Sequence, residues 1–131
     1  MTPEAERVKA FCERVVEYEK AYQIYWQNQK GIQEDDSICE TSEQIRAEKI
    51  PYCRLVARAR GEVYDLIKES NLTPLQRRVM YYRYNKAWTM KRISNTVHLT
   101  NRRVRQIRAE ACERMIPTMD RMYPDWQIGD K

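Results

Sequence analysis

Residues 89–111, TMKRISNTVHLTNRRVRQIRAEA, decide the fold of this chain. Thr89 and Thr100 each stand directly before a run in which apolar residues recur every three or four positions, and threonine in that place typically caps a helix. His98 and Leu99 leave only a short turn between the two predicted helices. Two helices joined by such a turn are typical of a helix-turn-helix, whose second helix enters the major groove of DNA.

The second of these helices is expected to have two chemically different faces. Apolar residues share one face at helical spacing, namely Val104, Ile107, Ala111 and Met115. The opposite face carries Arg102, Arg105, Gln106 and Ala109. One face is therefore predicted to pack on the protein while the other stays open to a ligand.

The sequence before this pair predicts a further short helix, from Pro74 to about Tyr84. Thr73 can cap it, and proline suits the first helical position because the N–H group that it lacks would have no helical partner there. The apolar residues Leu75, Val79 and Tyr82 then fall on one face.

The N-terminal residues predict one long amphipathic helix. Thr2, Pro3 and Glu4 form a helix start, and the helix is expected to end near Gly31. Its apolar seam alternates steps of three and four residues through Val8, Phe11, Val15, Tyr18, Tyr22 and Tyr25. Residues 33–42 are polar, acidic and without periodicity, which predicts a loop where the chain reverses.

A second long helix is expected to follow this loop. Thr41 or Ser42 can cap it, and Pro51 either kinks it or begins it afresh. Its seam consists of Tyr52, Val56, Ala59, Val63 and Leu66. The two seams need partners, so they cover each other in an antiparallel hairpin or join an intermolecular coiled coil.

The chain is therefore predicted to be all-α. We expect an N-terminal helical hairpin over residues 1–71, a helix-turn-helix domain over residues 72–116 and a C-terminal tail over residues 117–131. The hairpin is expected to serve oligomerisation or partner binding.

Positive charge is concentrated in the helix-turn-helix segment. Residues 71–116 carry eleven basic and two acidic side chains, a net charge of +9. The first seventy residues carry −3 and the last fifteen carry −1. Such a field attracts a polyanion and gives salt-dependent encounter with a phosphate backbone.

The residues that catalysis or metal binding would need are sparse. The chain has one histidine, His98, no glycine-rich phosphate loop, and four cysteines without CxxC spacing: Cys12, Cys39, Cys53 and Cys112. We therefore expect no enzyme activity, no cofactor and no metal, with the cysteines reduced and mostly buried. No apolar stretch is long enough to cross a membrane and no export signal is evident, which predicts a cytoplasmic location.

The segment LTPLQRRVMYYRY with WTMKRISNTVHLT and TNRRVRQIRAEA resembles region four of bacterial sigma factors, a helix-turn-helix family. The run VRQI after a capping threonine is the most specific part of this resemblance. Region four behind a helical N-terminal segment is also similar to small phage-encoded transcription regulators, including activators of late operons. The resemblance implies binding to promoter DNA and contact with RNA polymerase.

By the same resemblance, base contacts fall on Asn101, Arg102, Arg105 and Gln106. Arg105 and Gln106 match the family pattern, whereas Asn101 and Arg102 replace its usual arginine and glutamate, which implies a different target sequence. The chemistry also fits without the resemblance, because arginine and glutamine can form paired hydrogen bonds with guanine and adenine. The residues expected to hold phosphates are Thr89, Lys91, Arg92, Thr100, Arg103 and Arg108.

The sequence therefore predicts a transcription regulator that reads double-stranded DNA in the major groove with the helix after Thr100. RNA polymerase and a second copy bound through residues 1–71 are the expected protein partners. Two alternatives stay open. One is a DNA-packaging subunit similar to a phage small terminase, and the other is a module that binds RNA polymerase or an anti-sigma protein and touches DNA weakly.

Overall fold

The computed structural model describes residues 1–34 and 42–129, with side chains placed for residues 1–24 and 53–129. Its helices are α1 (Pro3–Glu34), α2 (Ser42–Glu69), α3 (Pro74–Tyr84), α4 (Met90–Val97) and α5 (Asn101–Met122). No strand occurs in these two ranges, which confirms the all-α prediction. Among the described helices, none combines the length and the apolar character that a membrane span requires.

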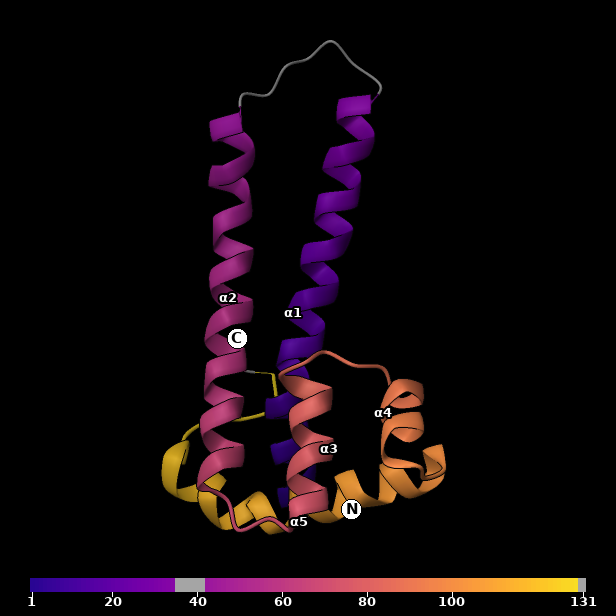
Figure 1. Ribbon diagram of the computed structural model, residues 1–131. Helices are drawn as coiled ribbons and strands as arrows, with labels where there is room; N and C mark the ends of the chain where they lie inside the picture. The colour runs from indigo at the N-terminus through magenta and orange to yellow at the C-terminus, as the bar shows by residue number, and fades with distance from the viewer. Residues whose placement is uncertain (35–41, 130–131) are drawn as a thin grey trace.

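The helices α1 and α2 form an antiparallel hairpin that extends away from a base built by α3, α4 and α5 (Figure 1). The predicted hairpin is thus confirmed, although the loop expected at its tip lies mostly in residues 35–41, outside the described residues. Helix α1 continues to Glu34 instead of ending near Gly31, since one glycine inside a helix costs only about 1 kcal/mol. Helix α2 runs through Pro51 without restarting.

The hairpin and the base share one hydrophobic core. Side chains from α1, α2, α3 and α5 meet in a single buried cluster that includes Val8, Phe11, Val63, Leu66, Tyr84 and Met115. Both predicted seams are confirmed where they lie near α3 and α5: Val8, Phe11 and Val15 of α1 and Ala59, Val63 and Leu66 of α2 are buried. Tyr25 and Tyr52 lie outside the described side chains. Because α1 and α2 bury their seams against α3 and α5 as well as against each other, the hairpin is not packed as an independent module.

The buried thiols belong to the same cluster. Cys12 and Cys112 are fully buried, and burial raises the pKa of Cys112 to about 12. Cys53 is exposed on α2 and is thus the exception among the three described cysteines, which are mostly buried as expected, and Cys39 lies outside the described residues.

The C-terminal end differs from the predicted tail. Helix α5 continues through Pro117 to Met122, so residues 117–122 are helical. Met119 and Met122 extend the apolar face of Met115, and burying one methionine contributes about 1.5–3 kcal/mol. That gain is comparable to the roughly 3 kcal/mol that a proline inside a helix costs, so burial offsets the break that Pro117 would otherwise cause.

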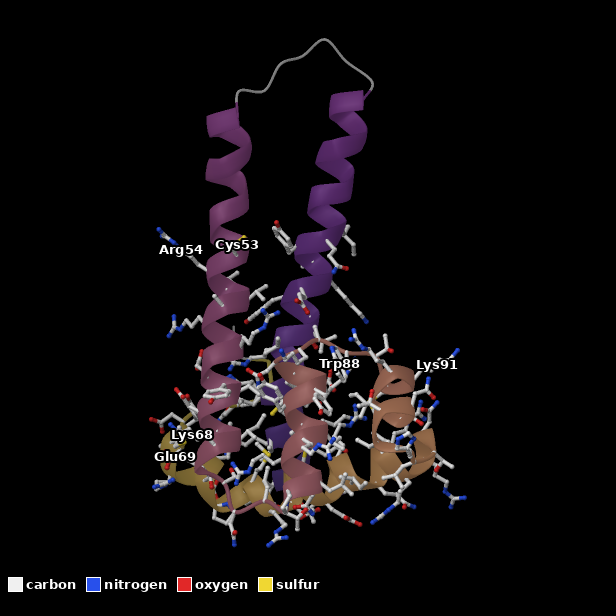
Figure 2. The ribbon with its side chains drawn as sticks, in the orientation of Figure 1. Cys53, Arg54, Lys68, Glu69, Trp88 and Lys91 are labelled. Atoms are coloured by element: carbon white, nitrogen blue, oxygen red, sulfur yellow. The ribbon has the colours of Figure 1, made fainter. Side chains whose placement is uncertain are left out.

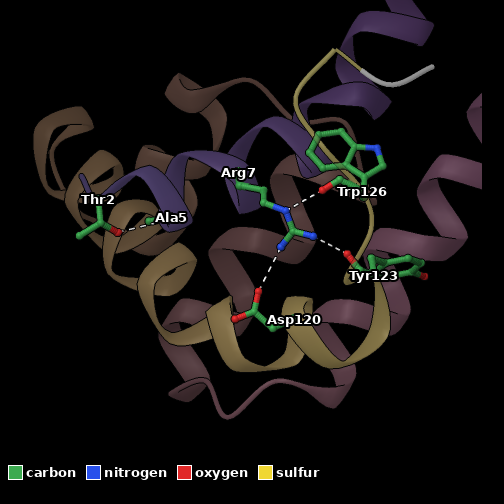
Figure 3. A network of polar contacts seen from close by, with 6 residues as sticks. All are labelled: Thr2, Ala5, Arg7, Asp120, Tyr123 and Trp126. Atoms are coloured by element: carbon green, nitrogen blue, oxygen red, sulfur yellow. Dashed lines mark hydrogen bonds and ion pairs between the residues drawn. The ribbon is translucent and has the colours of Figure 1, made fainter.

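Residues after α5 fold back onto α1, where Arg7 holds them (Figure 3). The guanidinium of Arg7 donates from Nε to the carbonyl of Trp126 at 2.7 Å and from Nη2 to the carbonyl of Tyr123, and it pairs with Asp120 at 3.2 Å. The ring of Phe11 also contacts this segment, with its centroid 4.6 Å from that of Tyr123 and 5.3 Å from that of Trp126. The C-terminal segment is therefore fixed to α1 by polar and aromatic contacts together.

Candidate nucleic-acid interface

Helices α3, α4 and α5 enclose a second, smaller core. Val79, Ile93, Val104 and Ile107 are fully buried in it. Half-buried side chains complete it, among them Leu75, Tyr82, Trp88, Met90, Val97 and Leu99. The apolar faces predicted for the three helices thus meet each other, which leaves the opposite face of α5 outside the core.

The three predicted N-caps are confirmed. The hydroxyls of Thr89 and Thr100 accept from the backbone N–H groups of Arg92 and Arg103, at 3.2 and 3.1 Å. Thr73 does the same for Gln76, whose side chain accepts in return from the backbone N–H of Thr73, forming a capping box. Each cap fixes the residue at which its helix begins, and the cap at Thr100 places the first turn of α5.

The turn between α4 and α5 depends on a left-handed residue. His98 ends α4 with φ 58° and ψ 42°, and the N–H of Leu99 then donates to the carbonyl of Ser94 at 3.1 Å. A left-handed residue at this place allows the chain to leave the helix and satisfy its last carbonyls. His98 is therefore a turn residue, as the sequence indicated.

We expect the cap at Thr100 to contribute measurably to stability. Thr100→Ala removes the hydroxyl and should lower the free energy of unfolding by about 1 kcal/mol. Urea unfolding followed by circular dichroism measures the change. Thr100→Ser keeps the hydroxyl and is the control, so equal losses in both variants would contradict a capping role.

The four predicted base-reading residues lie together on the exposed side of α5. Asn101, Arg102, Arg105 and Gln106 are all exposed, whereas the neighbouring residues Val104 and Ile107 are buried. Positions three and four apart share a helix face, so the four side chains form one surface over the first two turns. Arginine, asparagine and glutamine there present the donors and acceptors that base edges in the major groove match.

A family model described as Sigma-70, region 4 matches residues 70–115. This segment is a sigma region 4-like helix-turn-helix. It is a DNA-binding domain of a kind that serves transcription regulation, and it comprises α3, α4 and α5 as far as Met115. Comparison of the chain with curated proteins and with solved structures gave no match.

The region 4-like domain carries its candidate phosphate contacts around the base-reading face. Lys91 and Arg92 are exposed in the first turn of α4, and the guanidinium of Arg92 lies 3.9 Å from the ring centroid of Trp88. Trp88 in turn stacks on Tyr82 at 4.4 Å with an interplanar angle of 15°. Trp88 is thus covered by Tyr82 and Arg92, which fits its place at the edge of the smaller core.

Arg103 is exposed and points along α5. Its Nη1 lies 3.4 Å from Glu110 and donates to Oε1 of Gln106 at the same distance. An exposed pair of this kind contributes little to stability, so phosphate can replace Glu110 as the partner of Arg103. The hydrogen bond from Arg103 also contacts the amide of Gln106, one of the four predicted base-reading residues.

Arg108 is placed differently from the other predicted phosphate contacts. Its side chain is only 14% exposed, and its Nη1 lies 3.5 Å from Oε1 of Glu13 on α1. Position 108 follows the buried Ile107 and faces α1, because α1 packs along α5. We therefore no longer count Arg108 among the phosphate contacts of the region 4-like domain.

Tyr84 and Arg83 make contacts near the interface that the sequence did not predict. The hydroxyl of Tyr84 donates to Oε1 of Glu13 at 2.8 Å, and burial raises the pKa of Tyr84 so that it keeps the donated proton. Arg83 donates to the carbonyl of Trp88 at 3.1 Å and closes the loop before α4, in which Ala87 has φ 57°. No local pattern marks these contacts, because each depends on how separate segments meet.

Lys91 should contribute affinity without sequence preference. Lys91→Ala should weaken binding to every duplex by a similar factor and reduce the slope of log K against log salt by about 0.9, since one fewer counterion is released. Arg54, which lies on α2 on the opposite side of the molecule in Figure 2, provides the control Arg54→Ala. A loss confined to one sequence, or an equal change of slope in the control, would contradict a phosphate contact at Lys91.

Proposed function

We propose that this chain is a transcription regulator that reads a specific double-stranded DNA site with α5 and acts there together with RNA polymerase. One observation carries the proposal: four side chains suited to base edges are exposed on the capped first turns of α5. The match to Sigma-70, region 4 supports DNA binding by the same segment. The net charge of +9 over residues 71–116 supports attraction to the phosphate backbone.

A groove between α2 and α3 supports the protein partner. It has a volume of about 510 Å³, and its lining includes the rings of Tyr64 and Tyr81, whose centroids lie 6.4 Å apart. Tyr64 is 45% exposed, and the basic side chains of Lys68 and Arg78 also line the groove. A groove lined by tyrosines and basic side chains complements a protein segment that carries both apolar and acidic side chains.

The rings of this groove favour a protein over a single-stranded nucleic acid. Lys86 lies over the ring of Tyr81 at 5.9 Å and Arg78 over that of Tyr82 at 5.8 Å, while Tyr82 also stacks on Trp88. Base stacking needs free ring faces, and neighbouring side chains already lie over Tyr81 and Tyr82, two of the three tyrosines that line the groove. We therefore assign the groove to RNA polymerase and the exposed face of α5 to DNA.

A transcription assay separates the two surfaces. The template carries a duplex selected from a random pool for binding to this chain, and transcription is measured with bacterial RNA polymerase. Tyr64→Ala should abolish most of the regulatory effect and leave duplex affinity unchanged, whereas Arg105→Ala should abolish both. Leu55→Ala removes another exposed apolar side chain from α2 and is the control. Equal effects of Tyr64→Ala and Leu55→Ala would contradict a polymerase contact at the groove.

Two narrower roles belong to the same proposal. A homodimer through residues 1–71 stays a prediction, and the side chains of Ile24 and Leu55 are two of the exposed apolar groups in the described part of this region that a second copy would cover. Control of phage late genes predicts lysis and morphogenesis genes downstream in the genome. A gene for a large terminase subunit next to this one would instead favour the packaging alternative.

A further inference from the structure

One carboxylate that lies outside the region 4-like domain connects two helices of that domain. Glu13 lies on α1, and its Oε1 accepts from the hydroxyl of Tyr84, the last residue of α3, at 2.8 Å. The same oxygen lies 3.5 Å from Nη1 of Arg108, which belongs to α5. Glu13 thereby joins α1 to both α3 and α5.

The side chain of Arg108 also has neighbours other than Glu13. Its Nη1 also approaches Sδ of Met90, the first residue of α4, at 4.0 Å, and its Nε is buried without a hydrogen-bond partner. The side chains of Arg108 and Glu13 are 14% and 24% exposed, so salt screens their attraction less than it screens a surface pair. The guanidinium consequently stays at the junction of α1, α4 and α5.

This position changes what an arginine in a recognition helix contributes. Arg108 follows Gln106 by two residues, and Arg102, Arg103 and Arg105 precede it on the same helix. Any arginine that reaches a phosphate adds affinity for every sequence, whereas base contacts alone add preference for one sequence. Removing one cation from the phosphate contacts therefore lowers the affinity for every duplex by a similar factor and makes that affinity less dependent on salt.

We infer that Glu13 limits the general affinity of the region 4-like domain for duplex DNA and the salt dependence of that affinity, because it holds Arg108 away from the phosphate backbone. The inference rests on the proposed duplex binding by α5 and extends it to a residue of the N-terminal helix. Glu13 acts through Arg108 and does not itself touch DNA. It also keeps α5 in position against α3, since Tyr84 and Arg108 share the same carboxylate oxygen.

The test compares salt dependence in four variants of the full chain. Glu13→Gln keeps an amide oxygen that can accept from Tyr84 and removes the charge that holds Arg108. Arg108→Gln removes the cation, and the double variant removes both. Glu17→Gln is the matched control, because Glu17 is exposed one turn further along α1 and its loss changes the net charge equally. The probes are a duplex selected from a random pool by the unaltered chain and a scrambled duplex of the same length.

Glu13→Gln should steepen the slope of log K against log salt by about 0.9, the value for one additional phosphate contact. Its affinity for the selected and the scrambled duplex should rise by a similar, several-fold factor, so that the preference between them is unchanged. Arg108→Gln alone should leave the slope unchanged, and the double variant should return the slope to that of the unaltered chain. A merely structural role of Glu13 would lower the unfolding midpoint without steepening the slope.

Several results would overturn the inference. One is an unchanged slope in Glu13→Gln, and another is an equal steepening in Glu17→Gln, which would reflect net charge alone. Should Glu13→Gln not fold, Arg108→Gln decides, because a flatter slope in that variant would mean that Arg108 already binds a phosphate. If selection yields no preferred duplex, the proposed function fails, whereas the slope measured on the scrambled duplex still tests the inference. A clear preference with unchanged slopes refutes the inference alone.

Discussion

Replacing Arg105 with alanine should lower the affinity of the chain for its selected duplex by roughly 5- to 150-fold, the equivalent of about 1–3 kcal/mol for a paired contact to one base. Arg105 is exposed between the buried residues Val104 and Ile107, on the face of α5 that we propose to read the bases. Gln106→Ala should have an effect of the same kind at a neighbouring base pair. Equilibrium binding to the selected duplex and to each of its single-base variants measures both.

The loss should be selective. Arg105→Ala should bind all variants at one base-pair position with similar affinity, while preference at the other positions is retained. Arg114→Ala is the matched control, because Arg114 is an exposed arginine further along the same helix. If Arg105→Ala weakens binding to a scrambled duplex by the same factor, Arg105 contacts phosphate and the assigned reading face is wrong.

The parts of this interface that could be predicted are those that depend on neighbouring residues in the sequence. A capping threonine acts on an amide three residues away, and a helix face repeats every three or four residues. Thr89, Thr100 and the apolar face from Val104 to Met115 were therefore recognisable without the structure. The caps and the apolar face agree between sequence and structure because each depends only on residues a few positions apart.

Arg108 could not be predicted in this way. Its charge and its place in α5 are those of a phosphate-binding arginine, and only the packing of α1 against α5 brings Glu13 beside it. The contact between Tyr84 and Glu13 likewise joins residues 71 positions apart. A single sequence holds no periodic signal for such pairs, so the position of Arg108 against α1 is evident only from the structure.

The end of α5 has the same explanation. Pro117 and the polar residues after it favour a tail, since proline commonly follows the end of a helix. The contacts that keep this segment ordered come from Arg7 and Phe11, at the opposite end of the sequence. Local propensity is therefore overridden by long-range burial, which the apolar spacing of Met115, Met119 and Met122 only partly indicated.

Phe11→Ala should lower the free energy of unfolding by about 3–5 kcal/mol, the range for removing a buried phenylalanine and leaving a cavity. The side chain of Phe11 is fully buried, its ring contacts those of Tyr123 and Trp126, and the guanidinium of Arg14 lies 4.0 Å above it. Single domains are commonly stable by only about 5–15 kcal/mol, so the variant should lose a large share of its stability.

Because the hairpin and the region 4-like domain share one core, this loss of stability should destabilise the region 4-like domain as well. Urea unfolding followed by tryptophan fluorescence and by circular dichroism should show one transition in both the unaltered chain and Phe11→Ala, with the midpoint lowered in the variant. Ile24→Ala removes an exposed apolar side chain from the same helix and should change stability by less than about 0.5 kcal/mol. Two separate transitions, with the second unaffected by Phe11→Ala, would mean that the region 4-like domain folds without the N-terminal helix and that the shared core does not couple them.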